Sequence, residues 1–437
     1  MTDTSPPSNL THSYLDLLAP NHEAGLTIGG HAVEAIAGRF GTPCYIYDAA
    51  ILRQRLQSVV QSLGTEVLYS LKANPSLAVA DVLRQAGAGA EVTSAGEILV
   101  AQRAGFDSSR MQFVGPGKSS ADLRLAVESG VGCIHLESAG EYDVLAELAG
   151  DLGTRPRVGI RVNPIGTSTS ARIRMSGGSQ KFGVDDDAVG TLLERILTDD
   201  LVEFRGLHCF TGSQCFDAGA WLQSCAELLD LARQIETEHS IQVPVVDLGG
   251  GFGVPCFEDD PEFDLAAAGS GLRSLLQDHS GREVFVELGR YLTAPAGIYV
   301  SRVNYLKNSD GRRFAILDGG MHHHGAAAGV GAVLRRPFPI VLARDPLAVG
   351  GEAVTLCGPL CTPMDNFVDD LAMPELQPGD LVAVLCSGAY GLCFSQAAFN
   401  GHPTPAEVLV DRDSVSLVRA AGRAQDTLRG QFLPGEA

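Results

Sequence analysis

The apolar positions of this chain follow a repeating alternation between about residues 49 and 289. Short apolar runs alternate there with longer stretches in which apolar residues recur at helical spacing. This alternation predicts βα units and a parallel sheet. We expect strands at Val67–Leu71, Ala90–Thr93, Gln112–Val114, Cys133–Leu136, Arg157–Val162, Gly206–Phe210, Val245–Leu248 and Val284–Glu287. Eight strands are the number that a closed (β/α)8 barrel requires.

The helices expected between these strands are amphipathic and contain few candidate catalytic or binding residues. They include Ala78–Gln85, Ala95–Ala104, Ala121–Glu128 and Ala220–Glu238. Polar residues and glycines gather instead where the strands end. Because a barrel of this kind forms its active site at the C-terminal ends of its strands, this bias indicates a functional site there.

The pattern changes after about Thr293, where glycines and prolines punctuate strands without long helices. This predicts a second, β-rich domain. Its expected strands are Gly297–Leu306, Arg313–Leu317, Ala353–Leu356, Leu381–Leu385 and Ala406–Leu409. The expected fold class is α/β. The expected parts are a loose N-terminal tail (1–25), a strand and short helix that pair with the β-domain (26–47), the barrel (48–292) and the C-terminal β-domain (293–437).

Composition narrows the class of protein. The chain has 437 residues, 45% of them hydrophobic and 19% charged, and a formal net charge of −20. Such acidity argues against a nucleic-acid partner or an anionic membrane surface. No apolar run is long enough to span a bilayer, and the first residues do not resemble a signal peptide. Ten scattered cysteines without a CxxC pair predict reduced thiols. We expect a soluble, cytoplasmic protein.

Lys72 is the first candidate for chemistry. It follows the apolar run Val67–Leu71 and precedes the turn Ala73-Asn74-Pro75. Burial disfavours the ammonium form of a lysine, so a desolvated amine at this strand end could attack an aldehyde and hold it as a Schiff base. Taken alone, the same lysine could extend its charged end into solvent.

Two further strand ends suggest an anionic ligand. Gly249, Gly250 and Gly251 follow an apolar strand, and bare backbone amides there could bind a phosphate. The run does not fit GxGxxG, and Gly115–Ser119 lacks the first glycine of a Walker motif, so nucleotide binding is poorly supported. Glu287-Leu288-Gly289-Arg290 offers a carboxylate for a pyridine nitrogen and a guanidinium for a phosphate.

The β-rich half holds three more candidates. Cys361 lies on a loop shaped by glycine and proline and could donate a proton in a cleft. Tyr390 could pack in the core or contact a phosphate. The run His322-His323-His324 could bind a metal, but no acidic or cysteine ligand set accompanies it. We therefore expect no metal site.

Together and in this order, these motifs resemble the pyridoxal-phosphate-dependent decarboxylases of the alanine-racemase fold type, a group that includes diaminopimelate, ornithine and arginine decarboxylases. The resemblance covers about Thr27 to Val410. It implies an alanine-racemase-like fold, in which a (β/α)8 barrel precedes a β-domain. It also implies a homodimer with shared active sites and pyridoxal 5'-phosphate as cofactor.

The resemblance assigns roles residue by residue. Lys72 would hold the cofactor covalently, with Glu91 beside it, and Glu287 would bind the pyridine nitrogen. Cys361 would reach in from the partner subunit and return a proton after carbon dioxide leaves. The remaining cofactor contacts, most of them to the phosphate, would come from His208, Phe210, Ser213, Gly249, Gly250, Gly251, Gly289, Arg290 and Tyr390.

This chain departs from the best-known members at two positions. Where they have His-x-His-Ile-Gly-Ser, it has His208-Cys209-Phe210-Thr211-Gly212-Ser213, so Phe210 replaces the imidazole that stacks on the cofactor. Whether Phe210 or His208 faces the ring depends on strand register. Members that decarboxylate diaminopimelate or ornithine follow the cysteine with an acidic residue that binds the distal amine, but here Thr362 follows it. A free basic amino acid is therefore a poor candidate substrate.

These features resemble those of a smaller branch of the family. This branch contains a decarboxylase of carrier-bound glutamate from butirosin biosynthesis and relatives that act on citryl-linked substrates. We therefore expect a specialised biosynthetic decarboxylase whose substrate is a conjugate, presented by an acyl-carrier protein or citryl-linked, and contacts Thr362, Asp365, His322 and Arg335. Three alternatives remain: decarboxylation of diaminopimelate or a basic amino acid, racemisation, and a non-catalytic regulatory homologue.

Overall fold

The computed structural model describes residues 9–18, 24–164, 171–176, 179–279, 281–331 and 336–436. The chain divides into two compact units. We call Arg53–Val254 with Pro261–Leu292 the barrel unit, and Met1–Leu52 with Pro255–Asp260 and Thr293–Ala437 the β-domain unit. Each unit is described by itself.

The barrel unit is built on eight parallel strands that close on themselves, which confirms the expected fold class. Each strand pairs with the next, β7 pairs with β8, and β14 pairs with β4 to complete the ring. The strands are β4 (Glu66–Ser70), β5 (Gly89–Val92), β6 (Met111–Phe113), β7 (Cys133–Leu136), β8 (Arg157–Asn163), β11 (Glu203–His208), β13 (Val245–Gly250) and β14 (Glu283–Leu288). All eight fall where the apolar runs predict them.

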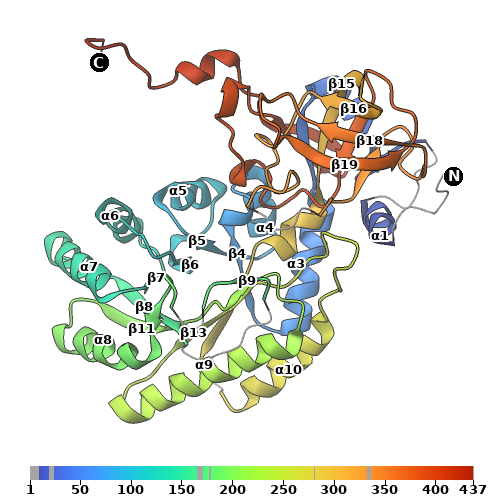
Figure 1. Ribbon diagram of the computed structural model, residues 1–437. Helices are drawn as coiled ribbons and strands as arrows, with labels where there is room; N and C mark the ends of the chain where they lie inside the picture. The colour runs from blue at the N-terminus through green and yellow to red at the C-terminus, as the bar shows by residue number, and fades with distance from the viewer. Residues whose placement is uncertain are drawn as a thin grey trace. The chain divides into compact units, whose positions relative to one another are not determined.

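Helices surround these strands, as Figure 1 shows for α5 to α10. The helices are α3 (Ala49–Leu63), α4 (Leu77–Gln85), α5 (Ala95–Ala104), α6 (Ser120–Glu128), α7 (Ala139–Leu152), α8 (Asp186–Asp199), α9 (Ala218–His239) and α10 (Leu265–Gln277). Serines begin three of them, because the hydroxyls of Ser94, Ser119 and Ser138 each accept a backbone N–H three residues on. These caps start each helix directly after the strand-end loop, where the polar residues gather.

The β-domain unit contains a sheet in the order β19-β18-β16-β15-β3-β21-β22. Strand β20 also pairs with β15, and β17 pairs with β20. Its strands are β3 (Cys44–Asp48), β15 (Gly297–Ser309), β16 (Arg312–Leu317), β17 (Ile340–Leu342), β18 (Glu352–Cys357), β19 (Asn366–Met373), β20 (Leu381–Val384), β21 (Ala406–Asp411) and β22 (Ser414–Arg419). Strand β3 pairs with β15 and β21. The segment before the barrel thus contributes a strand to the same sheet as the later strands.

The N-terminal segment differs from the expectation of a loose tail. Asn9–Leu18 form helix α1, with Tyr14, Leu15 and Leu18 buried. The Tyr14 hydroxyl donates to the carbonyl of Pro255 within the same unit at 2.5 Å. Apolar residues at this spacing lie on one face of a helix, and their burial holds the segment. The sequence interpretation missed this short pattern beside a polar, proline-containing start.

Two expectations about the whole chain can be compared with the structure. No helix among the described residues is long and apolar enough to cross a membrane. No disulfide joins the cysteines, all of which lie in the described part of the chain.

Candidate active site

Lys72 lies at the C-terminal end of a barrel strand, in the single turn η1 (Leu71–Ala73) that follows β4. Ser70 pairs in register with Glu91 of β5, which brings the two strand ends together. Lys72 Nζ donates to Glu91 Oε1 at 3.0 Å. The lysine side chain keeps 28% exposure, whereas Glu91 is fully buried. Lys72 is therefore a paired, partly exposed amine rather than the desolvated one that the sequence suggests.

Glu91 is held in an unusual state for a carboxylate. Burial raises its pKa, and the nearby Lys72 ammonium opposes that shift. Its second oxygen, Oε2, has no hydrogen-bond partner in the described part of the chain. A buried oxygen of this kind is available to a ligand that binds beside Lys72.

His208 and Phe210 take different places in the barrel unit. Strand β11 ends at His208, which is fully buried and reaches Glu287 from its Nε2 atom at 3.4 Å. Lys72 Nζ lies 5.2 Å from the centre of the Phe210 ring. Both side chains therefore lie on the interior side of the barrel, with Cys209 between them in sequence. Phe210 is the ring beside the lysine, and His208 lies beside Glu287.

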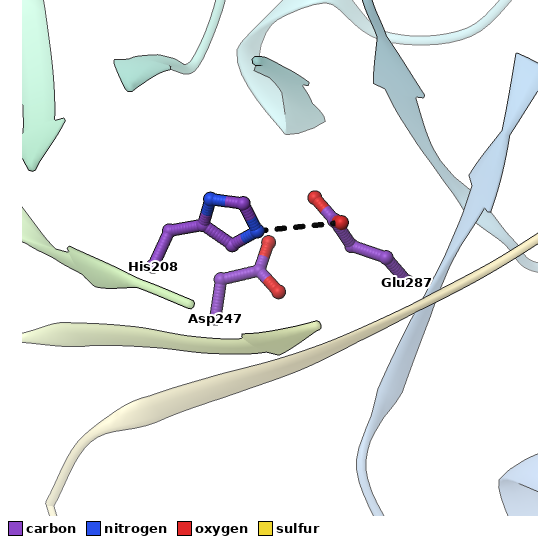
Figure 2. Close-up of side chains that lie close together, drawn as sticks. All are labelled: His208, Asp247 and Glu287. Carbon is purple, nitrogen blue, oxygen red and sulfur yellow. Dashed lines mark ion pairs between the residues drawn. The ribbon is translucent and has the colours of Figure 1, made fainter. Parts of the chain in front are cut away.

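His208, Asp247 and Glu287 converge in the barrel interior from the ends of β11, β13 and β14 (Figure 2). One ligand-type atom from each lies within 4.8 Å of the others. All three side chains are at most 1% exposed. Neither oxygen of Glu287 has a hydrogen-bond partner among the described residues. The spacing of these three side chains alone would also suit a metal ion, although the sequence predicts no metal site.

Burial sets the charges of this cluster. Burial, and next the charge of Glu287, raises the pKa of Asp247 well above its ordinary value. Burial also raises the pKa of Glu287, against the opposing charges of Lys72 and Arg161. The pKa of His208 falls well below its ordinary value because of burial and, next, the charge of Arg161. The histidine is therefore neutral at pH 7, so the cluster has no cation of its own.

The glycine run after β13 passes very close to other backbone. Gly249 and Gly251 have φ of +59° and +76°, which favour glycine. A Cβ on Gly251 would collide with the carbonyl of Gly212, which pairs with β9 (Ile173–Arg174) as part of β12 (Gly212–Ser213). The run therefore lies directly beside the segment that carries Ser213. Backbone amides and a hydroxyl gathered in this way suit a phosphate.

Gly289 and Arg290 lie directly after β14 in the same unit. A Cβ on Gly289 would lie 2.6 Å from the side chain of Ala73 and 3.1 Å from the carbonyl of Ser70. A glycine is therefore needed where β14 passes the turn that carries Lys72. Arg290 begins the short helix α11 (Arg290–Thr293).

The remaining candidates lie in the β-domain unit. Cys361 is exposed, and its N–H donates to Asn400 Oδ1 at 3.2 Å. Asp365 is 3% exposed and accepts the backbone N–H groups of Met321 and Leu360 at 2.6 and 2.8 Å. Asp365 therefore fixes the shape of the Cys361 loop, and a contact with substrate stays a prediction.

Three other predicted residues, His322, Tyr390 and Arg335, belong to the same unit. His322 has 0% exposure, and neither ring nitrogen has a hydrogen-bond partner among the described residues. A contact between His322 and substrate stays a prediction. Tyr390 has φ of +51° and packs edge-on against Phe394. Arg335 lies outside the described residues, and its neighbour Arg336 pairs with Asp259 at 3.1 Å.

Comparison with known proteins identifies the family of this arrangement. The family model "Pyridoxal-dependent decarboxylase, pyridoxal binding domain" matches residues 49–294, more than half of the chain. This chain belongs to the pyridoxal-dependent decarboxylases. Because the family is shown and its relatives are decarboxylases, the interpretation as a non-catalytic homologue is not supported.

Individual relatives of this decarboxylase cover nearly its whole length. It is 38% identical to the L-glutamyl-[BtrI acyl-carrier protein] decarboxylase of Niallia circulans, over 92% of this chain and 96% of that one. It is 32% identical to the diaminopimelate decarboxylase of Zymomonas mobilis, over 91% and 94%. The crystal structure of diaminopimelate decarboxylase from Helicobacter pylori complexed with L-lysine matches with a TM-score of 0.82 at 27% identity, over 91% and 98%.

The barrel residues of this decarboxylase fit pyridoxal phosphate. Glu287 is a buried carboxylate without a donor among the described residues, and a protonated pyridine nitrogen would supply one. Lys72 would hold the aldehyde carbon, and the Gly249–Gly251 run with Ser213 would bind the phosphate. When bound, the cofactor supplies an electron sink that stabilises the charge left when carbon dioxide departs.

The sequence interpretation missed Asp247 as a member of the site. It placed the residue inside the expected strand Val245–Leu248 and gave it no role. The available signal was a carboxylate at the end of an apolar strand, in line with the polar residues that end the other strands. The distance to Glu287 could not be foreseen, because it depends on the pairing of β13 with β14.

Proposed function

We propose that this decarboxylase removes the α-carboxylate of an amino acid whose distal end is joined to a larger group, such as an acyl-carrier protein. Thr362 carries the proposal. The distal ammonium of a free diamino acid needs an anionic partner when it is buried, and Thr362 supplies none. The Niallia circulans relative, which is named for a carrier-bound glutamyl substrate, supports the same class of substrate.

The contacts of Thr362 are consistent with a site that has no charge clamp. Its N–H donates to the carbonyl of Leu360 at 2.8 Å, and its hydroxyl accepts the N–H of Met364 at 3.3 Å. The side chain therefore serves the loop that follows Cys361. An uncharged distal group, such as an amide or a thioester, can pass this position without leaving an unpaired charge.

In the barrel unit, Lys72 holds the cofactor and Glu91 orients the amine by its hydrogen bond. The flat ring of Phe210, whose centre lies 5.2 Å from Lys72 Nζ, would exclude water from one face of a cofactor held by that lysine. Glu287 binds the pyridine nitrogen and keeps it protonated. His208 stays neutral behind Glu287 and packs on His135, with the two ring centres 4.9 Å apart. We assign these roles from the contacts of the unit and from the family motifs.

In the β-domain unit, the exposed Cys361 returns a proton to the substrate carbon, and the role of Tyr390 in phosphate binding stays a prediction. We propose that this cysteine serves the site of a second copy, so that the active form is a homodimer. Arg336 is already paired with Asp259 and Asp260. An acidic carrier would therefore need other basic residues for its docking.

Replacement of Thr362 tests the proposal. Thr362→Glu supplies the missing carboxylate, and we expect at least a tenfold gain in the ratio of kcat/KM for free diaminopimelate over kcat/KM for a glutamyl thioester. Thr362→Gln has the same size without the charge and should not raise the ratio. A wild-type enzyme that already prefers the free diamino acid, with no effect of Thr362→Glu, would overturn the proposal.

A second candidate is decarboxylation of a free diamino acid. The identity of 32% to the Zymomonas mobilis diaminopimelate decarboxylase over 91% of the chain favours it. Under this alternative another acidic residue would pair with the distal amine. Rapid turnover of free diaminopimelate by the wild-type enzyme would favour it.

A further inference from the structure

Asp247 faces two different parts of the barrel site. Its Oδ1 atom accepts the N–H of Gly249 at 3.0 Å. Its Oδ2 atom is buried and has no hydrogen-bond partner among the described residues. Figure 2 shows its carboxyl group between His208 and Glu287, and ligand-type atoms of the three lie within 4.8 Å of one another. One side chain thus connects the glycine run with the carboxylate assigned to the pyridine nitrogen.

The backbone around Asp247 explains why this residue can serve both parts. Strands β13 and β14 pair in register at Asp247 and Phe285, and again at Gly250 and Glu287. Three steps along β13 therefore match two steps along β14, which is a β-bulge. The bond from Gly249 N–H to Asp247 Oδ1 spans the extra residue as an Asx turn. This turn supports the positive φ of Gly249.

We propose that Asp247 is a positioning residue that couples the two ends of the cofactor site. One of its oxygens fixes the glycine run through Gly249. The other oxygen donates a hydrogen bond to the carboxylate of Glu287.

Charge balance in the barrel interior supports the second half of this role. Asp247 and Glu287 lie close together, and each side chain is at most 1% exposed. Ionising both carboxyl groups would therefore cost a large free energy. Burial and the charge of Glu287 raise the pKa of Asp247 well above its ordinary value, whereas Lys72 and Arg161 favour the ionised form of Glu287. Asp247 is therefore the group that keeps the proton, and a protonated carboxyl can donate it to an ionised neighbour.

The proposal predicts separable losses at the two ends of the cofactor. The glycine run affects the phosphate, so its disturbance weakens binding of pyridoxal phosphate more than binding of pyridoxal. The state of Glu287 affects the pyridine nitrogen, so its disturbance changes the absorption spectrum of the bound cofactor. Each loss can be measured on the purified protein without turnover.

Two substitutions keep the turn at Gly249 and test the contact with Glu287. Asp247→Asn keeps an acceptor for Gly249 and an N–H donor for Glu287. We expect cofactor affinity within about threefold of wild type and an unchanged absorption band, because both hydrogen bonds remain. Asp247→Ser keeps an acceptor for Gly249 in an analogous turn, but it is too short to reach Glu287. We expect an unchanged ratio of pyridoxal-phosphate to pyridoxal affinity, with a shifted absorption band that resembles that of Glu287→Gln.

The test uses the full-length protein, freed of cofactor and titrated with pyridoxal phosphate or pyridoxal. Asp143→Asn, an exposed carboxyl on α7, is the matched control and should behave as wild type. The proposal is overturned if the absorption bands of Asp247→Ser and Asp247→Asn are the same as that of wild type. It is also overturned if Asp247→Asn loses affinity for the cofactor as strongly as Asp247→Ser. Thermal unfolding of each apoprotein identifies any variant that fails to fold, and the folded variant of the pair then decides.

Discussion

Lys72 Nζ donates a hydrogen bond of 3.0 Å to Glu91 Oε1 across the ends of two neighbouring barrel strands. The pair forms because Ser70 and Glu91 are partners in the β4–β5 ladder, so the turn after β4 carries the lysine to the carboxylate. The ammonium is thus oriented before any cofactor arrives. Chemistry at this strand end depends on both members of the pair.

Lys72→Ala should abolish decarboxylation and the covalent retention of the cofactor. The variant lacks the amine that holds the aldehyde, while Glu287 and the glycine run remain. The measurement is carbon dioxide release, together with the absorbance that stays with the protein after denaturing gel filtration. Lys307→Ala, an exposed lysine of β15, is the matched control. Full turnover by Lys72→Ala would contradict the assignment.

Glu91→Gln should slow the loading of the cofactor. The substitution keeps the shape of the side chain but removes the charge that orients the ammonium. The glutamine oxygen still accepts the N–H of Lys72, so only the charge assistance of about 1 kcal/mol is lost, which corresponds to roughly a fivefold lower rate constant. Stopped-flow absorbance after mixing apoprotein with pyridoxal phosphate gives this rate constant. A variant that loads as fast as wild type would show that Glu91 does not orient the lysine.

Cys361→Ser should retain the cofactor and lose turnover. A serine hydroxyl is a weaker acid than a thiol, so return of the proton to the substrate carbon becomes slow. General acid catalysis contributes about 10²–10⁴-fold, and we expect kcat to fall by part of that range. Cys393→Ser changes another exposed thiol of the same unit and should keep its activity. Equal kcat values for the two variants would remove Cys361 from the mechanism.

Acid should destabilise the β-domain unit through its histidine run. Burial lowers the pKa of His322, His323 and His324 to about 3, 4 and 3. The unfolded chain therefore binds protons below about pH 6.5 that the folded chain does not. Stability is complete above that pH and falls toward pH 4, by roughly 2 kcal/mol for each histidine at pH 5.

His322→Asn separates this effect from general acid denaturation. His322 faces the rings of His323 and His402 and has no hydrogen bond to lose among the described residues. Its replacement should reduce the loss in the urea midpoint between pH 7 and pH 5, because one group fewer takes up a proton on unfolding. His239→Asn, near the end of α9, should leave the loss unchanged. Equal losses in the two variants would exclude His322 as a source of acid sensitivity.

The barrel could be predicted from sequence because its strands are short apolar runs between amphipathic helices. The eight strands lie within a few residues of their expected positions. Helix α1 escaped prediction because ten residues give a weak periodic signal. Strand β19 escaped as well, because two adjacent exposed acidic residues, Asp369 and Asp370, interrupt its apolar residues. Short or polar elements depend on tertiary packing more than on local pattern.

The candidate site could be predicted residue by residue, but not as a set of contacts. Lys72 and Glu287 stand near strand ends, where sequence reasoning looked for chemistry, whereas Glu91 came from the family resemblance. His208 and Phe210 are two residues apart, so a regular strand would place both side chains on one face. That β11 ends at His208 and that the Phe210 ring lies beside Lys72 are visible only in the structure. Asp247 was missed for a related reason, since a bulge in β13 determines its distance from Glu287.

Carbon dioxide release by the cofactor-loaded wild-type enzyme tests the central claim most directly. The substrates are free L-glutamate, free diaminopimelate, and L-glutamate joined through its side-chain carboxyl to a pantetheine thioester or to an acyl-carrier protein. The account predicts release from the tethered compounds, with kcat/KM at least 100-fold above that for either free amino acid. Faster release from free diaminopimelate than from every tethered compound would contradict it.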